Sequence, residues 1–378
     1  MKIRKVTAAD LALGMLIPWN VYGENGILLV RKGHRIASAN QLEYLIERGS
    51  IEELDEQEPE LREPDSALRK LDAAYLESHA LLQSVALGTA PVGLRRRLEE
   101  VVTLITDAVE LDTDIATASI LHNQRQAVYP ARHSVNTAIV ALLLAKARER
   151  SPQDTMTIML AALTMNVGML DHHQRWHDSH AALDATDRAR MLAHPEHSVR
   201  LLRLAGITDE AWLACVLEHH ENEDGTGYPQ SKSGAQIEHL SKLIAQADRY
   251  CARVSERSYR PTMTPHAALR DILLESRSTL HSSLASILVR ELGIYPIGTY
   301  VRLINGEIAV VSRRGLQSTT PHVESVVGPR GAPLEVFLKR DTRADLHGIR
   351  EVLTNAQVAA MQAPPLRMKQ VWGRAAAH

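Results

Sequence analysis

The longest regular pattern in the chain is helical. From residue 66 to residue 292, apolar positions recur at spacings of three and four residues, and proline or glycine signals interrupt them near 90, 130, 152, 195, 206 and 225–234. Such a period is typical of amphipathic helices that bury one face. The pattern therefore predicts an all-α body of about eight to ten helices.

A different pattern precedes this body. Residues 15–33 contain two short β-prone runs separated by glycines, and residues 38–49 form a helical pattern between a serine N-cap and a terminating glycine. We expect a small α+β domain at the N-terminus.

The pattern changes again after the helical body. Residues 298–314 alternate apolar and polar positions around Asn305-Gly306, a pair that suits a two-residue hairpin turn because both residues tolerate positive φ. We expect a small β-containing C-terminal region in a mainly α protein. The two prolines that follow Gln362 favour a frayed tail.

An acidic stretch marks the first domain boundary. Residues 52–65 hold eight acidic residues, one arginine and two prolines, which favours a solvated, extended connector. The expected division is an N-terminal domain at 1–57, an acidic linker and helical connector at 58–112, a main helical domain at 113–295, and a C-terminal extension at 296–378.

Charge and composition exclude several classes of partner. The 43 basic and 45 acidic residues give a net charge of -2, so no whole-chain field recruits nucleic acid or an anionic membrane. The apolar stretches at 137–145 and 155–170 are too short or too interrupted to span a bilayer. Two cysteines and the lack of a signal-peptide pattern predict a cytoplasmic location. The sequence does not indicate an oligomeric state.

Five residues are candidates for binding metal. Each lies in or at the end of a helical pattern, where an all-α body can direct side chains from several helices into one pocket. Imidazole and carboxylate groups suit iron, manganese or zinc. Alternatively, each histidine is a hydrogen-bonded core or surface residue. The candidates are His133, His194, His219, His220 and Asp248.

The order of the motifs resembles a known family. The stretch "HHENEDGTGYP" (219–229) is similar to the signature of the HD-GYP family of metal-dependent cyclic-di-GMP phosphodiesterases. The pieces "YPARHS" (129–134), "HPEHSVRLL" (194–202) and "IAQADRYCARVSERSYR" (244–260) match in the same order. Several spaced motifs in order are more specific than any single one. The resemblance covers roughly residues 113–292 and implies an HD-GYP domain at 113–295.

The resemblance assigns roles residue by residue. It implies iron or manganese ions bound by His133, His194, His219, His220 and Asp248. It also implies a loop that approaches the nucleotide and basic residues that contact its phosphates. These ligand-binding positions are Asp224, Gly225, Gly227, Tyr228, Pro229, Arg257 and Arg260.

The His-Asp dyad that gives the family its name is missing. Where the family has "HDIGK", this chain has "MNVGM", so Met165 and Asn166 occupy the dyad positions and Met169 replaces the lysine. Asn166 is nearly isosteric with aspartate but neutral, and a thioether is a poor ligand for iron or manganese. No catalytic residue is therefore assigned. The second aspartate of the family's "DxxDA" pattern is also replaced, by Cys251.

Three features leave the metal content open. The site can hold no metal ion, one ion on His194, His219 and His220, or two ions. Cys251 is either a thiolate ligand or a packed core residue, with packing favoured. The run "DHHQRWHDSH" (171–180) reads as an exposed loop in preference to a set of displaced ligands.

Three functions compete at this point. The favoured one is a bacterial cyclic-di-GMP signalling protein that binds the nucleotide, or a protein partner, with impaired catalysis. The second is an active metal-dependent phosphodiesterase with a reduced or rearranged metal site. The third is a purely structural protein that binds no nucleotide. Members of the family can associate with diguanylate cyclases, although no feature of this sequence indicates such a partner.

Overall fold

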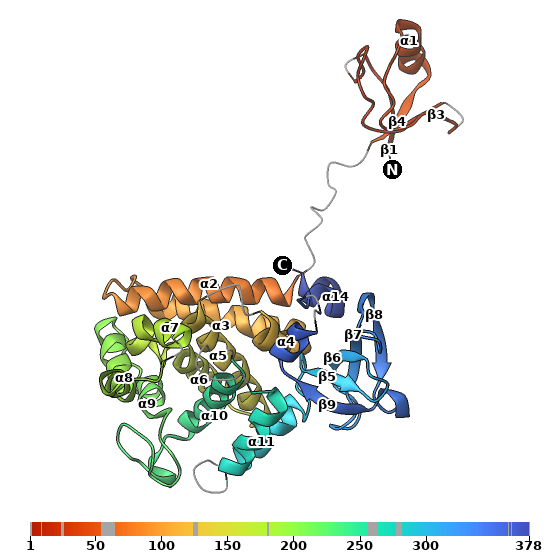
Figure 1. The fold of residues 1–378 in the computed structure, drawn as a ribbon. Helices are drawn as coiled ribbons and strands as arrows, with labels where there is room; N and C mark the ends of the chain where they lie inside the picture. The colour runs from red at the N-terminus through yellow and green to blue at the C-terminus, as the bar shows by residue number, and fades with distance from the viewer. Residues whose placement is uncertain are drawn as a thin grey trace. The chain divides into compact units, whose positions relative to one another are not determined.

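The computed structural model describes two compact units (Figure 1). The described residues are 2–8, 10–23, 26–53, 65–123, 128–179, 181–255, 263–276, 282–361, 363 and 365–377. The units are Met1–Pro64 and Asp65–His378.

The N-terminal unit is a small α+β domain, as predicted. Ser38 caps its helix by accepting a hydrogen bond from the backbone N–H of Gln41. A Cβ atom on Gly49 would lie 2.2 Å from the Leu45 carbonyl oxygen, so the helix end requires glycine. An antiparallel sheet in the order β1-β4-β2-β3 packs on the helix. The elements are β1 (Lys2–Lys5), β2 (Val21–Tyr22), β3 (Leu28–Val30), α1 (Ala39–Arg48) and β4 (Ser50–Glu53).

The second unit begins with the helical body. Its described residues form eleven α-helices, slightly more than the sequence pattern predicts. One reason is that Asp112 both ends α3 and caps α4, so a single residue separates two helices that read as one pattern. The helices are α2 (Ala67–Ala86), α3 (Leu94–Leu111), α4 (Thr113–His122), α5 (Tyr129–Ala147), α6 (Pro152–Thr164), α7 (Leu170–Asp178), α8 (Ala185–Leu204), α9 (Glu210–Glu218), α10 (His239–Val254), α11 (Pro265–Glu275) and α12 (Ser282–Leu292), with 3-10 turns η1 (Val167–Met169) and η2 (Gly234–Gln236).

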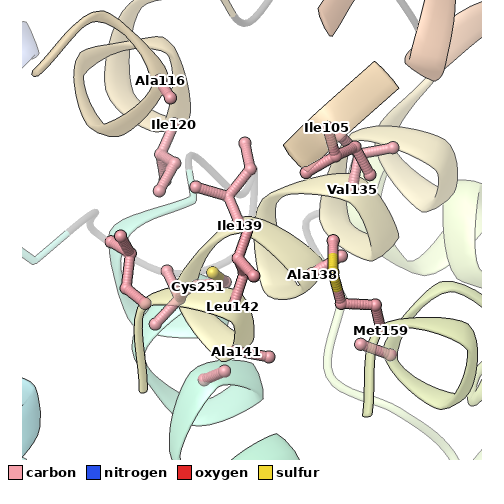
Figure 2. Close-up of a cluster of buried hydrophobic side chains, with 14 of the residues drawn as sticks. Ile105, Ala116, Ile120, Val135, Ala138, Ile139, Ala141, Leu142, Met159 and Cys251 are labelled. Atoms are coloured by element: carbon pink, nitrogen blue, oxygen red, sulfur yellow. The ribbon is translucent and has the colours of Figure 1, made fainter. Parts of the chain in front are cut away.

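Helix α5 is the centre of this body. Every residue from Tyr129 to Ala145 is buried, and the helix packs against α2, α3, α6 and α10 (Figure 1). A helix that is buried on all sides is enclosed by others, and the polar residues in the first half of α5, His133 among them, lie in that interior. Figure 2 shows Ile139 and Leu142 of α5 beside Cys251 of α10. The position of His133, in the first turns of α5, is therefore fixed by the core itself.

A five-stranded antiparallel sheet in the order β8-β7-β6-β5-β9 follows the helices. His122 at the end of α4 joins it to the body through a ring-nitrogen contact of 2.7 Å with the Gly298 carbonyl. The strands and later helical elements are β5 (Tyr300–Leu303), β6 (Ile308–Arg313), β7 (His322–Val327), β8 (Pro333–Asp341), η3 (Asp345–His347), β9 (Ile349–Leu353), α13 (Asn355–Ala360), α14 (Met368–Trp372) and η4 (Gly373–Ala376).

Two expectations for this region are wrong. The β5–β6 turn is not a two-residue one: Leu303 N–H donates to Glu307, and Gly306 alone of the expected pair has positive φ. A longer loop closed by one left-handed glycine results. The described part of the tail is not frayed either, because it forms α14 and η4, and Met368 and Ala376 are buried.

No helix among the described residues combines the length and apolar character needed to cross a bilayer.

Cys251 lies fully buried in the hydrophobic cluster of α5 and α10 (Figure 2), and burial raises the pKa of its thiol. This favours packing over metal ligation. We expect Cys251→Ala to lower the free energy of unfolding by about 1–2 kcal/mol and to leave the metal content unchanged. Denaturant unfolding and elemental analysis of the purified protein measure the two quantities. Loss of bound metal in this variant would show that the thiolate is a ligand.

Candidate metal and ligand site

Three histidines from two helices converge in the body. His194 lies on α8, while His219 and His220 follow directly after α9, which ends at Glu218. Adjacent residues inside a helix point about 100° apart, but the helix end relaxes this geometry. One ligand nitrogen from each ring lies within 4.8 Å of the others. The structure thus brings together three of the five predicted metal ligands.

The hydrogen bonds of two rings define their proton positions. Nδ1 of His194 lies 2.5 Å from the Met191 carbonyl oxygen, and Nδ1 of His219 lies 2.7 Å from the Val216 carbonyl oxygen. A carbonyl only accepts, so each neutral ring carries its proton on Nδ1 and a lone pair on Nε2. The two Nε2 atoms nevertheless lie 3.2 Å apart. Facing lone pairs repel unless a positive charge lies between or beside them.

A proton does not supply that charge at neutral pH. Burial, reinforced by the neighbouring His219, lowers the pKa of His194 to about 3. Burial also lowers the pKa of His219 and holds the pKa of His220 well below its usual value. All three imidazole rings are therefore neutral, which is the protonation state in which histidine binds a metal ion. The set fits a metal ion with three imidazole ligands.

The other two predicted ligands form a separate pair. Nε2 of His133 lies 2.7 Å from Oδ1 of Asp248, and both residues are buried. Burial would raise the pKa of Asp248, but the hydrogen bond from His133 keeps it below its usual range. An imidazole N–H that donates to a carboxylate is a satisfied contact. This pair, unlike the facing Nε2 atoms of His194 and His219, is joined by a hydrogen bond, while the buried Nδ1 of His133 has no partner.

The two dyad positions have separate environments. Met165 is fully buried in the hydrophobic core and is not among the residues that line the cavity. Asn166 does line it, and its buried Oδ1 has no hydrogen-bond partner. Gly168 survives for a steric reason, because a Cβ atom there would lie 2.5 Å from the Ser198 nitrogen and 2.7 Å from the His194 oxygen. Only close packing of η1 on α8 is retained from this motif.

A cavity of about 230 Å³ lies between His194 and His220 on one side and the His133–Asp248 pair on the other. Among the described residues that line it, Asp248 is the one carboxylate. Two methionines and several aromatic rings form much of the remaining wall. The lining residues are Tyr129, His133, Asn166, Met169, His173, Trp176, His177, Leu183, Met191, His194, His220, Tyr228, Asp248 and Ala252.

The expected exposed loop at 171–180 is wrong. Its described residues belong mostly to helix α7, and His173, Trp176 and His177 line the cavity. His177 stacks on Tyr129 with ring centroids 4.1 Å apart, and Tyr129 in turn lies 5.5 Å from the His133 ring. Sequence reasoning missed these residues because their polarity suggested a loop. Their spacing of three and four residues, which places them on one helix face, was the available signal.

The loop after the histidine pair folds back on its own backbone. A Cβ atom on Gly227 would lie 2.4 Å from the Asn222 nitrogen and 2.5 Å from the His220 oxygen. The N–H of Tyr228 donates to the same His220 oxygen. The Glu221 side chain is buried and accepts backbone N–H bonds from Gln230 and Lys232. The loop is thus a rigid element built on the metal-ligand segment.

The predicted nucleotide-contacting residues divide into three groups. Tyr228 lines the cavity and stacks on His220 at 4.6 Å, while Pro229 follows it through a cis peptide bond. The exposed Asp224 instead binds Thr226, and Gly225 has a φ of +78°. Neither Asp224 nor the two loop glycines line the cavity. The calls on Arg257 and Arg260 lie outside the described residues.

Comparison with known proteins places this site in context. A family model described as "HD domain" matches residues 115–284. A cyclic di-GMP phosphodiesterase of Pseudomonas aeruginosa is 30% identical over 199 residues, which are 52% of this chain and 47% of that protein. A 3'3'-cGAMP-specific phosphodiesterase of Vibrio cholerae is 32% identical over 37% of this chain and 30% of its own length. The chain therefore matches half or less of these relatives.

The fold has a solved counterpart. Bd1817, an HDG"Y"P protein from Bdellovibrio bacteriovorus, superimposes with a TM-score of 0.51 over 76% of this chain and 98% of that chain. The two sequences are 14% identical, so this similarity establishes the fold alone.

Gly227→Ala should destabilise the protein by about 1–3 kcal/mol or more, because the new methyl group would overlap backbone atoms that cannot move independently. Denaturant unfolding measures the loss. Gly23→Ala is the matched control, since its Cβ atom would meet a leucine side chain at an ordinary 3.4 Å. Equal, small effects of both substitutions would contradict the assigned loop geometry.

Metal-free protein should lose stability as the pH falls below about 6.5. Folded His194 resists protonation down to a pKa of about 3, whereas an unfolded histidine takes up a proton near its ordinary pKa of about 6.5. The unfolded state then binds more protons, so this residue costs up to about 1.4 kcal/mol per pH unit in that window. Urea unfolding in chelator from about pH 7.5 to 5 measures the slope. His194→Gln should reduce it, and an unchanged slope would show that His194 is not the group responsible.

Proposed function

Because this chain belongs to the HD-GYP family of HD domains, we propose that its cavity binds cyclic di-GMP in bacterial second-messenger signalling, with hydrolysis impaired. The observation that carries the proposal is that this chain has most of the residues that the family resemblance implies for the site but lacks the His-Asp dyad. His194 and His220 of the three-histidine set, the His133–Asp248 pair and Tyr228 lie around one cavity, while the dyad positions hold a core methionine and a neutral amide.

The missing dyad bears on catalysis through charge. A phosphodiesterase with two metal ions needs them about 3.5–4 Å apart to polarise phosphate and activate water. Two divalent ions at that distance repel by roughly 18 kcal/mol at an effective dielectric of 20, so bridging anions must offset the repulsion. Asn166 stands where the family has aspartate and brings no negative charge. The expected consequence is weak or absent turnover.

The retained residues divide the work of binding. A metal ion on His194, His219 and His220 would attract a phosphate oxygen of the ligand. The Tyr228 ring, which stacks on His220, limits the orientation of a ligand that enters the cavity. A cavity of about 230 Å³ is smaller than the ~300–1,000 Å³ of pockets that enclose a drug-sized ligand. It therefore accommodates a phosphate and its neighbouring groups, with the rest of a cyclic dinucleotide outside.

Two further points belong to the proposal. Iron or manganese is the cofactor that the family resemblance implies, and a diguanylate cyclase is the kind of protein partner that it suggests. Asp224, Gly225, Gly227, Pro229, Arg257 and Arg260 keep their proposed nucleotide-binding role, although the loop glycines also have the structural role described above.

The alternative is an active phosphodiesterase with a reduced metal site. The observation in its favour is the three-histidine set itself, because three imidazoles plus an open position also occur in catalytic metal sites. The relatives' names make both cyclic di-GMP and 3'3'-cGAMP reasonable substrates to test.

Calorimetric titration with cyclic di-GMP and 3'3'-cGAMP, with chromatographic assay of turnover in iron or manganese, tests the proposal. We expect binding without appreciable hydrolysis, and at least tenfold weaker binding in Tyr228→Ala because the ring that orients the ligand is lost. Tyr44→Ala, at an exposed tyrosine of α1, is the control and should bind normally.

The other outcomes separate the competing functions. Robust hydrolysis that disappears in His219→Ala would replace the impaired-enzyme proposal with the active-enzyme alternative. No binding of either nucleotide would refute the assignment of this cavity to cyclic dinucleotides.

A further inference from the structure

We propose that this site holds a single metal ion and that its all-imidazole ligand set selects zinc over iron and manganese. The inference names the cofactor of the site and rests on the proposed assignment of His194, His219 and His220 as its metal ligands. It differs from the iron or manganese centre that the family resemblance implies.

The first argument is the contrast between two close contacts. His194 and His219 present lone pairs to each other across 3.2 Å, with both Nδ1 protons committed to backbone carbonyls. Two nitrogens bound to one tetrahedral ion at about 2.0–2.1 Å would lie roughly 3.3–3.4 Å apart. The observed spacing therefore suits two ligands of the same ion. The carbonyl contacts also orient the rings, as outer partners of metal-bound histidines do.

The second argument is that a second ion lacks negatively charged ligands. His133 and Asp248 lie 2.7 Å apart as donor and acceptor, and the two buried lining atoms beside them that have no hydrogen-bond partner, Nδ1 of His133 and Oδ1 of Asn166, are neutral. The His133 ring is also held on one side by Tyr129, which stacks on His177. Because Asp248 is the one carboxylate among the described lining residues, two divalent ions would carry four positive charges against one negative charge. One ion leaves an excess of one positive charge, which a bound phosphate can neutralise.

The third argument concerns metal identity. Manganese favours oxygen ligands, and here the predicted oxygen ligand is paired with His133. Three neutral imidazoles with an open fourth position form a well-known type of zinc site. The intrinsic order of affinity for nitrogen ligands also places zinc above manganese and iron. Met169 and Met191 in the cavity wall add an apolar surface and no hard donor atom.

Metal loading of the tag-free full chain tests this inference without any activity assay. Chelator-stripped protein is exposed anaerobically to equal concentrations of zinc, iron(II) and manganese(II), and bound metal is counted by mass spectrometry. We expect about one ion per chain, with zinc at least tenfold above either competitor. Cobalt(II) should give the intense visible absorption of tetrahedral coordination.

Matched variants locate the ion. His219→Ala should abolish loading, whereas His239→Ala, at a largely exposed histidine of α10, should not change it. Asp248→Asn should retain one ion, because the inference gives that carboxylate no direct metal bond. Circular dichroism confirms that each variant is folded.

Four outcomes would overturn the inference: two ions per chain, preferential loading of iron or manganese, loss of the ion in Asp248→Asn, or failure to load any metal. Nucleotide binding is measured separately, so a chain that loads zinc but ignores cyclic dinucleotides would refute the proposed function and leave this inference standing.

Discussion

The contact between Nε2 of His194 and Nε2 of His219 is the constraint on which the site depends. Both rings have their other nitrogen fixed by a backbone carbonyl of the same helical turn, so neither can turn away without breaking a buried hydrogen bond. The fold therefore holds the lone pairs of the two Nε2 atoms close together. Packing elsewhere in the protein must offset the free-energy cost of their repulsion. Local strain of this kind is common at sites that bind a ligand.

The surrounding elements keep this arrangement in place. Gly168 lets the turn before α7 lie directly on α8, next to His194. On the other side, Gly227 lets the loop close over the backbone of His220, and Glu221 fixes the far end of that loop. These residues act on backbone geometry. They hold the backbone of the site in place independently of the side chains that line the cavity.

Much of the fold could be predicted from the sequence because periodicity reports directly on burial. The three-to-four-residue period identified the helical body, and Ser38 capped its helix as expected. Secondary structure could not be predicted correctly where the local composition of a segment conflicts with its tertiary packing. The polarity of the run containing His173 and His177 predicts a loop, yet the run forms helix α7, and the cavity gives His173 a buried environment and His177 a half-buried one.

The site was partly predictable for a related reason. A sequence shows that histidines and a carboxylate are present, but not which of them pair. His133 and Asp248 are separated by 115 residues, and only the packing of α10 on α5 reveals the hydrogen bond between them. The sequence also does not show how closely Gly227 approaches other backbone atoms. Those atoms belong to its own loop, but the distances depend on how the loop folds. Arg257 and Arg260 lie outside the described residues, so their expected role stays a prediction.

The burial of Met165 constrains what can replace it. Its side chain lies in the main hydrophobic core, fully removed from solvent. A histidine at this position would place a polar ring among apolar side chains that offer it no hydrogen bond, at a cost of about 1–3 kcal/mol. An engineer who installs an imidazole here must therefore also repack the core around it, because the same position serves the stability of the whole helical body.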